Sequence, residues 1–527
     1  MLLFYNGTIH TMDAQHPSPD ALVVGDHGRI HFVGSFNQCE AAAGPRARKI
    51  DLGGHTLLPG FNDAHVHVWK VGLLLTVQVD VRQGLAPDIP AIQARFRQRA
   101  RNLPPGTWII GRGYNEATLP EKRHPTRHDL DAVSTTHPIV LTRTCGHMKV
   151  CNSLALQLAG ITPDTPAPPG GVIVRENGDL SGLLQETAMG LVDRIIPDLS
   201  DDEMALAISA AQEHQLALGI TSATDPLLMP NHTRVYRQME ADGALRVRLN
   251  GLPIRRPDGG TETLPLPEKF VTPMLRIDCV KFFADGGLSG ATAALSVPYK
   301  TVGGQGVLRF SDDELFALMY EAHAAGLRIA THAIGDVTIE QVLTTYERLH
   351  QRKPVPGLRH RIEHLGLPSA QQLRRCQAIG VIAVPQTVFI AALGTTFRRY
   401  LPDAFYARCY PVRAMLDAGL TVALSSDAPV VPDDNPLLGM KAARDRLDAN
   451  GQALAPEQAV SPYEALYGYT MGGALASGDA ENRGSLTPGK WADMIVLSGD
   501  PLHTHSENLL ELKVQQTYLG GQCVYEA

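Results

Sequence analysis

Between residues 216 and 429 the sequence repeats one pattern, a short apolar run followed by a loop and an amphipathic helix. Near-continuous apolar runs that alternate with helices are typical of parallel strands buried on both faces. An earlier run, LLPGFNDAHVHV, has the same strand-like character. Eight such strands favour an α/β fold with a closed (β/α)8 TIM barrel over a doubly wound sheet. The runs that we assign to strands are 57–68, 219–225, 245–252, 275–285, 327–336, 358–366, 380–389 and 420–429.

The two ends of the chain differ from this middle. Both contain short β-like runs with turn signals, such as Asn6-Gly7 near the start and Gly520-Gly521 near the end. Because chain termini often lie close together, we expect one small β-sandwich domain built from both ends. About a hundred residues then separate the first two barrel strands, far more than one helix needs, which indicates an inserted subdomain. The predicted boundaries are 1–58 and 486–527 for the small β-domain, 59–84 for the first barrel strand, 85–186 for the insertion and 187–485 for the rest of the barrel.

Composition excludes several classes of protein. The 527 residues are 44% apolar and 19% charged, which is typical of a globular protein, and the net charge of −7 comes without a basic run that could follow nucleic acid. The apolar runs are too short to span a membrane, and the first residues predict a strand and not a signal peptide. Seven scattered cysteines without a C-x-x-C pair suit a reducing compartment. We therefore expect a cytoplasmic protein with small-molecule partners rather than nucleic acid or membrane, and a homodimer is the default expectation for its assembly.

The first strand ends in His65-Val66-His67. Residues two apart on an extended strand share one face, so both imidazoles point the same way and form half of a metal site. An isolated H-x-H is weak evidence, because the chain contains a second one at 503–505. We assign that second pair to the small β-domain and not to the site.

Other strands also carry ionisable residues at their carboxyl ends. All carboxyl ends of a barrel open on the same mouth, which is where active sites of this fold lie. Each residue alone could be a core histidine or a helix cap, but six of them on five strands form a joint signal. The predicted metal-binding residues are His65, His67, Lys281, His332, His364 and Asp427.

Lys281 is unusual in this set, because an ammonium group beside two divalent cations would be repelled. A neutral lysine can take up carbon dioxide and become a carbamate, an anionic oxygen ligand that can bridge two metals. The alternative is a lysine paired with Asp285.

Several motifs resemble the amidohydrolase superfamily, and the resemblance covers nearly the whole chain. The insertion, GRGYNEATLP through CNSLAL, is similar to the N-substituted formamide deformylase-like (amidohydrolase 3) branch, although Asn115 and Cys145 depart from its pattern at positions where an acidic residue is common. The motifs that carry the resemblance are PGFNDAHVH, VKFFADG, THAIGD, IEHLG, SSDAP and RGSLTPGKWADMIVL.

The resemblance implies a metal-dependent hydrolase that cleaves a C–N bond of an N-substituted formamide or another N-acyl or cyclic amide. It implies two zinc ions, with iron, manganese or nickel also compatible with these ligands. One ion would be held by His65, His67 and Asp427, the other by His332 and His364, with carboxylated Lys281 between them. Asp427 would also be the catalytic base that takes the proton of a metal-activated water. The tentative substrate-binding residues are His147, Tyr114 and Glu116.

Three other functions stay open at this stage. A heterocycle deaminase of the same superfamily typically has one metal and no bridging lysine, so Lys281 argues against it. A hydrolase of esters, carbonates or lactones is open because an activated water attacks these bonds more readily than amides. A metal-free binding protein is disfavoured because all six ligand positions are filled.

Overall fold

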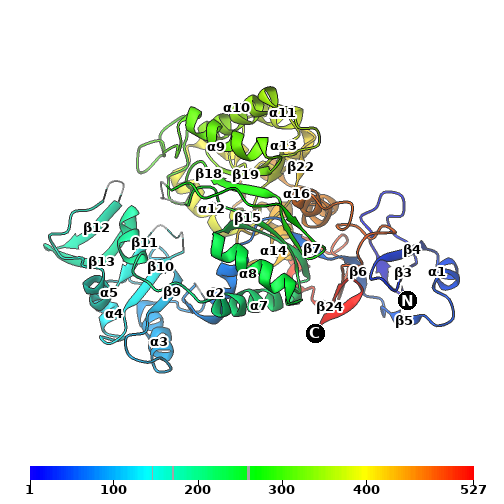
Figure 1. The fold of residues 1–527 in the computed structure, drawn as a ribbon, viewed down its shortest axis with the longest axis horizontal. Coiled ribbons are helices and arrows are strands. Elements are labelled where there is room, and N and C mark those ends of the chain that lie inside the picture. Colours follow the sequence, from blue (N-terminus) through cyan, green and yellow to red (C-terminus); the bar gives the residue numbers. More distant parts are fainter. Residues whose placement is uncertain (83, 145, 147, 169–170, 258–261, 432) are drawn as a thin grey trace. The chain divides into compact units, whose positions relative to one another are not determined.

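The structure is a computed structural model, and it describes residues 1–82, 84–144, 146, 148–168, 171–257, 262–431 and 433–527. The chain divides into two compact units (Figure 1). Unit 1 comprises Met1–Val68, Gln212–Ala428 and Asp433–Ala527, and unit 2 consists mainly of Trp69–Ala211. The chain passes between the units within helices α2 (Val68–Thr76) and α7 (Asp201–Ala217).

The middle of unit 1 is built from parallel strands that follow one another in chain order, with helices between them. One sheet contains β7 (Phe61–Asp63), β14 (Ile220–Leu228), β15 (Arg248–Pro253) and β17 (Leu275–Ile277), with β16 (Phe270–Val271) antiparallel at its edge. The other contains β18 (Cys279–Phe283), β19 (Arg328–Ala333), β20 (Arg361–His364), β21 (Ile382–Val384) and β22 (Thr421–Val422). The helices are α8 (Pro230–Ala241), α9 (Asp312–Ala324), α10 (Asp336–Arg352), α11 (Ala370–Ala378), α12 (Val388–Tyr400), α13 (Val412–Asp417), α14 (Pro436–Asp445), α15 (Pro462–Tyr467) and α16 (Gly473–Ser477).

Backbone hydrogen bonds join these two sheets on both sides. The amide of Arg255, after β15, donates to the carbonyl of Lys281 in β18 at 3.1 Å. On the other side, the amide of Asp427, after β22, donates to the carbonyl of His65, after β7, at 2.7 Å. The predicted mixed α/β alternation is therefore confirmed.

Two of the eight predicted strands are each divided in the structure. The run 275–285 breaks at Asp278, because β17 pairs with β15 whereas β18 pairs with β19. The run 57–68 breaks at Gly60, because β6 (Thr56–Pro59) pairs with β23 (Met494–Leu497) and β7 pairs with β14. A Cβ atom at Gly60 would lie 2.1 Å from Oγ1 of Thr221, so only glycine permits this crossing.

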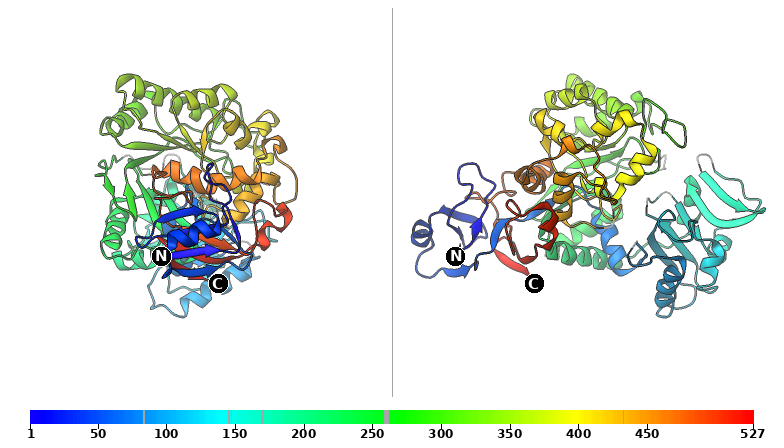
Figure 2. Two further views of the ribbon diagram at one scale, coloured as in Figure 1. Left: turned by 90° about the vertical axis from the view of Figure 1, so that its right-hand side faces the viewer. Right: turned by 180° about the vertical axis from the view of Figure 1, so that it is seen from behind.

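Strands from both termini share one hydrophobic core, and Figure 2 places them side by side. Phe4 and Leu22 from the start of the chain pack in the same cluster as Met494 and Tyr518 from its end. One sheet has the order β4 (Ile30–Gly34), β3 (Ala21–Val24), β1 (Leu2–Tyr5), β5 (Arg48–Asp51), with α1 (Phe36–Ala43) following β4 in the chain. The other has the order β2 (Thr8–Ile9), β6, β23, β24 (Val514–Leu519), β25 (Gln522–Glu526).

Several helix starts depend on local chemistry that the sequence contains. Ser200 and Ser461 each form a complete capping box with the glutamate three residues later. Ser311 caps α9 by accepting a hydrogen bond from the amide of Glu314. No helix formed by the described residues combines the length and apolar character that a membrane span requires.

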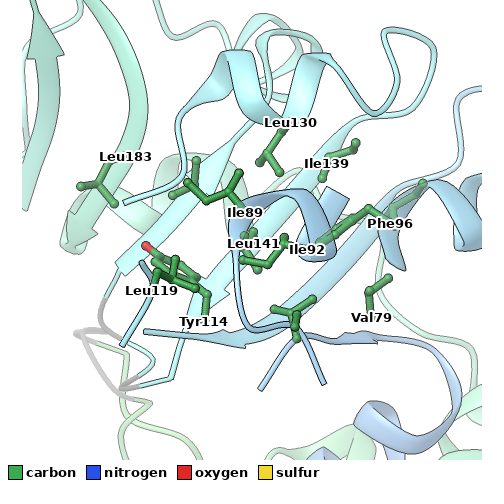
Figure 3. Packing of buried hydrophobic residues seen from close by; sticks show 14 residues of the cluster. Val79, Ile89, Ile92, Phe96, Tyr114, Leu119, Leu130, Ile139, Leu141 and Leu183 are labelled. Carbon is green, nitrogen blue, oxygen red and sulfur yellow. The ribbon is translucent and has the colours of Figure 1, made fainter. Parts of the chain in front are cut away.

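Unit 2 is a six-stranded sheet with a hydrophobic core on each face. Alternate residues of a strand point to opposite faces, so Ile139 and Leu141 pack with Phe96 (Figure 3) and Val140 joins the other core with Cys151. The strand order is β12 (Gly171–Glu176), β13 (Asp179–Glu186), β11 (Met148–Cys151), β10 (Ile139–Arg143), β9 (Ile109–Tyr114), β8 (Val79–Asp80). The helices of this unit are α3 (Ile89–Ala100), α4 (Arg127–Asp131), α5 (Ser153–Leu158) and α6 (Gly190–Asp193).

Candidate metal centre

All six predicted metal-binding residues lie in unit 1. Lys281 is in the middle of β18, and the other five lie near or beyond the carboxyl ends of the parallel strands. Ligand atoms of His65, His67 and Asp427 lie within 4.8 Å of one another. Oδ1 of Asp427 is 3.4 Å from Nε2 of His65 and 3.1 Å from Nε2 of His67. The ring centroid of His364 is 5.1 Å from that of His65 and 4.4 Å from that of His332. Four histidines and one carboxylate therefore form a continuous group.

The sequence predicted His65 and His67 at the end of a strand. In the structure they lie instead in the segment that follows β7. The predicted alternation is kept, because the amide of Val66 donates to the carbonyl of Thr224 on one side. The carbonyl of His65 and the amide of His67 bond to the 427–428 backbone on the other side. The carboxylate of Asp63 holds this segment in place of strand pairing, because it accepts hydrogen bonds from the amides of His65 and Ser426, both at 3.1 Å.

Three of the histidine rings have one nitrogen fixed by an acceptor. Nδ1 of His65 lies 2.5 Å from Oε2 of Glu363, and Nδ1 of His364 lies 2.5 Å from Oε1 of Gln386. Nε2 of His332 lies 3.0 Å from the carbonyl oxygen of Gly286. Carboxylate and carbonyl oxygens can only accept, so each of these nitrogens carries a proton. The other nitrogen of His332 and of His364 keeps its lone pair. Nε2 of His65 lies 3.4 Å from Oδ1 of Asp427, and although burial would lower the pKa of His65, Asp427 and Glu363 outweigh burial and raise this pKa.

Glu363 and Gln386 belong to the candidate centre through these contacts, and the sequence did not point to either of them. Glu363 is completely buried and accepts two hydrogen bonds from Arg361, whose guanidinium also donates to the carbonyl of Ala64 beside His65. The signal was present in RIEHLG, where Arg361 and Glu363 are two apart on one strand and share a face. The histidine that Glu363 would contact depended on packing between distant segments of the chain.

Electrostatics favours neutral rings on one side of the group and an ionised carboxylate on the other. Burial, together with Lys281, lowers the pKa of His332 well below its ordinary value, and burial with the neighbouring His332 does the same for His364. Burial by itself would raise the pKa of Asp427, but His65 and His67 more than offset it and hold this pKa well below its usual range. These protonation states are the ones in which imidazole and carboxylate bind a metal.

Lys281 is completely buried, and burial lowers its pKa to about 8. Its Nζ lies 4.7 Å from the ring centroid of Phe283. The pairing with Asp285 that we considered as an alternative is not present, because that carboxylate accepts instead from the amides of Ala294, Ile334 and Gly335 and from the hydroxyl of Thr338.

The backbone is strained at two of the six residues. His364 has φ of 72° and Asp427 has φ of 58°, in the left-handed region that residues with a Cβ rarely adopt. Each such conformation costs on the order of 1–3 kcal/mol and persists only where the surroundings impose it, which is common at functional sites.

The residues present fit a divalent metal. Among the described residues, none hydrogen-bonds to Nζ of Lys281 or to Nδ1 of His332, and a buried polar atom without a partner is costly. Imidazole nitrogens with fixed tautomers and an ionised carboxylate are the donor set that zinc and similar ions prefer.

The tentative substrate residues lie in unit 2. Tyr114 belongs to its hydrophobic core, and its hydroxyl lies 3.0 Å from Nδ1 of His124. Glu116 accepts two hydrogen bonds from Arg143, at 2.7 and 3.0 Å. His147 lies outside the described residues. The substrate role of these three residues stays a prediction.

Comparison with known proteins gives one consistent family. A sequence model described as the Amidohydrolase family matches residues 48–525. The putative amidohydrolase YtcJ of Bacillus subtilis strain 168 is 31% identical over 99% of this chain and 99% of its own. N-substituted formamide deformylase of Arthrobacter pascens is 30% identical over 100% of this chain and 98% of its own.

A solved structure agrees with these relatives. An uncharacterized metal-dependent hydrolase from Pyrococcus horikoshii OT3 superimposes with a TM-score of 0.79 at 27% identity, over 96% of this chain and 99% of the other. A family match of this extent, with relatives of nearly equal length, leaves one conclusion: the chain belongs to the amidohydrolase family.

Proposed function

We propose that this protein is a metal-dependent hydrolase that cleaves a carbon–nitrogen bond of an amide. The observation that carries the proposal is the orientation of three histidine rings, each held at one nitrogen by a separate acceptor, which leaves the other nitrogen for a ligand. A histidine buried only for packing needs a hydrogen-bond partner at both of its nitrogens. Three rings with the same arrangement, beside a buried carboxylate and a buried lysine, are better explained by metal binding.

We further propose a (β/α)8 barrel as the scaffold. The chain order of its parallel strands and the backbone bonds that join the two sheets on both sides support this. The domain boundaries predicted from the sequence, including a small β-sandwich and the insertion 85–186, are part of the same proposal. The shared core of the two chain ends supports the small domain.

Two zinc ions would be held by the six residues in the division that the family implies. His65, His67 and Asp427 would hold one ion and His332 and His364 the other, with carboxylated Lys281 between them. A bound metal ion would supply a water of lowered pKa and polarise the carbonyl of the substrate. The lowered pKa of Lys281 supports a neutral amine, the form that takes up carbon dioxide.

Asp427 would act as the base. Its carboxylate is ionised, it lies between two histidines, and its backbone is fixed by the hydrogen bond to the carbonyl of His65. It would take the proton from the attacking water and return it to the nitrogen that leaves, because an amide nitrogen is too poor a leaving group as an anion.

For the substrate we propose an N-substituted formamide or a related N-acyl amide. The support is the relative of that activity, which matches over the full length of this chain. Esters, lactones and heterocyclic amines are the competing substrates.

The decisive experiment is a hydrolysis panel of formamides, other amides, esters and heterocyclic amines, with metal content measured on the same sample. Asp427→Asn should keep much of the metal and lose turnover by about 10²–10⁴-fold, as for a general base. Asp417→Asn, an exposed aspartate that pairs with Arg413, is the control. Unchanged turnover in Asp427→Asn would remove it from this role, and deamination with one metal per chain would favour the deaminase.

The carbamate has a test that does not depend on activity. Protein equilibrated with ¹³C-bicarbonate should show a carbamate resonance that Lys281→Gln lacks. A resonance that persists in Lys281→Gln would assign the carbamate to another amine.

A further inference from the structure

A second group of residues of metal-ligating types lies in the part of unit 1 that is built from both chain ends. His10 follows β2, and Asp500 and His503 lie in the turn after β23. Nε2 of His10 is 2.9 Å from Oδ2 of Asp500, and Nδ1 of His503 is 2.8 Å from the same oxygen. The ligand atoms of all three residues lie within 4.8 Å of one another. His10 and Asp500 are 490 residues apart, so only the fold brings them together.

The orientation of Asp500 leaves one oxygen for the two rings. Its Oδ1 accepts the amide of Leu502 at 2.9 Å, and its main-chain carbonyl accepts the hydroxyl of Thr504 at 2.6 Å. Burial would raise the pKa of this carboxyl, but the hydrogen bonds from His503 and His10 outweigh it and lower the pKa. Oδ2 is therefore an ionised oxygen whose direction is fixed by the turn.

The two rings differ in exposure. His10 is buried, and its amide donates to the carbonyl of Leu57 in β6. His503 has 81% of its side chain exposed. The group thus has a rigid inner side and an open outer side, from which an ion and its water ligands could enter.

We propose that His10, Asp500 and His503 form a binding site for a divalent ion of the zinc type, separate from the six-residue centre. Two imidazole nitrogens and one carboxylate oxygen are a common partial ligand set for zinc, and water would complete the coordination. Metal–ligand distances of about 2.0–2.1 Å in a tetrahedral site place ligand atoms about 3.3 Å apart. The observed 2.8 and 2.9 Å from each nitrogen to the carboxylate oxygen differ from this value by a few tenths of an ångström. The ligand atoms of the two histidines lie within 4.8 Å of each other, and the exposed ring of His503 has room to adjust.

A bound ion would join the first strands of the chain to its last segment. Its ligands come from both chain ends, so binding would oppose their separation and would stabilise the folded state in proportion to metal occupancy. This role does not depend on the proposed hydrolase activity.

The competing explanation is a hydrogen-bonded group without metal, in which both rings donate to Asp500. Both explanations make the three residues important for stability, so stability alone cannot separate them. Zinc uptake can, because only the proposed site binds an ion.

The experiment uses full-length protein stripped with a chelator and then dialysed against zinc, with bound metal measured per chain. Wild type should bind about one more equivalent than His503→Ala or Asp500→Asn. His503→Ala is suited to this test because its exposed side chain can be removed without a packing defect. His505→Ala, an exposed histidine two residues further on in the same turn, is the matched control and should bind as wild type does.

A second set of variants tests whether the additional ion binds outside the six-residue centre. Asp427→Ala should lower zinc uptake at the six-residue centre but keep the difference between wild type and His503→Ala. Zinc should also raise the melting temperature of Asp427→Ala and not that of Asp427→Ala/His503→Ala. Equal zinc uptake by wild type, His503→Ala and Asp500→Asn would overturn the proposal, even if the two variants melted at lower temperature.

Discussion

At the scale of single residues, the candidate centre depends as much on the partners of the histidines as on the histidines. An imidazole binds a metal through one nitrogen, and the partner of the other nitrogen determines which tautomer is present. Glu363 serves His65 in this way and is itself held by Arg361. Arg361, Glu363 and His65 are all buried, so their geometry has little freedom to change.

Glu363→Gln should weaken metal binding at the centre by about 10–100-fold, because an amide can present its NH₂ group to His65 in place of an acceptor. The measurement is a competitive titration against a chelator, on protein whose fold is confirmed by circular dichroism. Stability should also fall, because Arg361 loses its buried counter-charge. Glu340→Gln, at the surface pair with Arg375, is the control. Metal affinity equal to wild type would show that Glu363 is only a partner of Arg361.

At the scale of elements, a group of three histidines links α9, α10 and the start of β20. His323 of α9 and His360 lie 2.9 Å apart, between Nδ1 and Nε2, and the ring of His350 of α10 is 5.5 Å from both. Nδ1 of His360 accepts the amide of Ile329 in β19, at 3.1 Å, so this ring is neutral in the native state. Burial, then His323, His350 and Arg328, lower the pKa of His360 well below its ordinary value.

This lowered pKa makes the stability of the folded protein depend on pH. The unfolded chain binds a proton at His360 below about pH 6.5, whereas the folded protein does not, so stability falls as pH decreases from 6.5 toward the folded pKa. The slope is at most about 1.4 kcal/mol per pH unit for each proton. Urea unfolding at pH 5, 6 and 7 should show a weaker pH dependence for His360→Asn than for wild type. The exposed His128→Gln is the control, and an equal dependence in His360→Asn would contradict the assignment.

The elements themselves were largely predictable, because helix caps and apolar runs are local signals. Ser461 with Glu464 at the start of α15 is one example. The Pro59-Gly60 turn signal indicated the division at Gly60, whereas the division at Asp278 was not predictable. A run of apolar residues does not specify which neighbour each half pairs with, and these pairings connect segments more than a hundred residues apart in the case of β7 and β14.

At the scale of the molecule, the candidate metal centre and the core of unit 2 belong to different compact units. Removal of metal by a chelator should therefore destabilise unit 1 and leave unit 2 nearly unchanged, because binding stabilises the state that contains the ligands. Hydrogen exchange should become faster in β18, β19 and β20 and stay the same in β9 and β10. Equal acceleration in both units would show that they unfold as one cooperative body.

The sequence alone determined the six candidate ligands and the alternation of strands and helices, because residue type and local periodicity carry that information. The tertiary structure determined the hydrogen-bond partners of these ligands. It directed Glu363 to His65 and Gln386 to His364, and it left Lys281 without Asp285. It also brought His10 to His503, whereas the H-x-H pair at 503–505 by itself indicated no site. Partners of buried polar groups are chosen by packing between distant segments, and no local pattern in a single sequence specifies that packing.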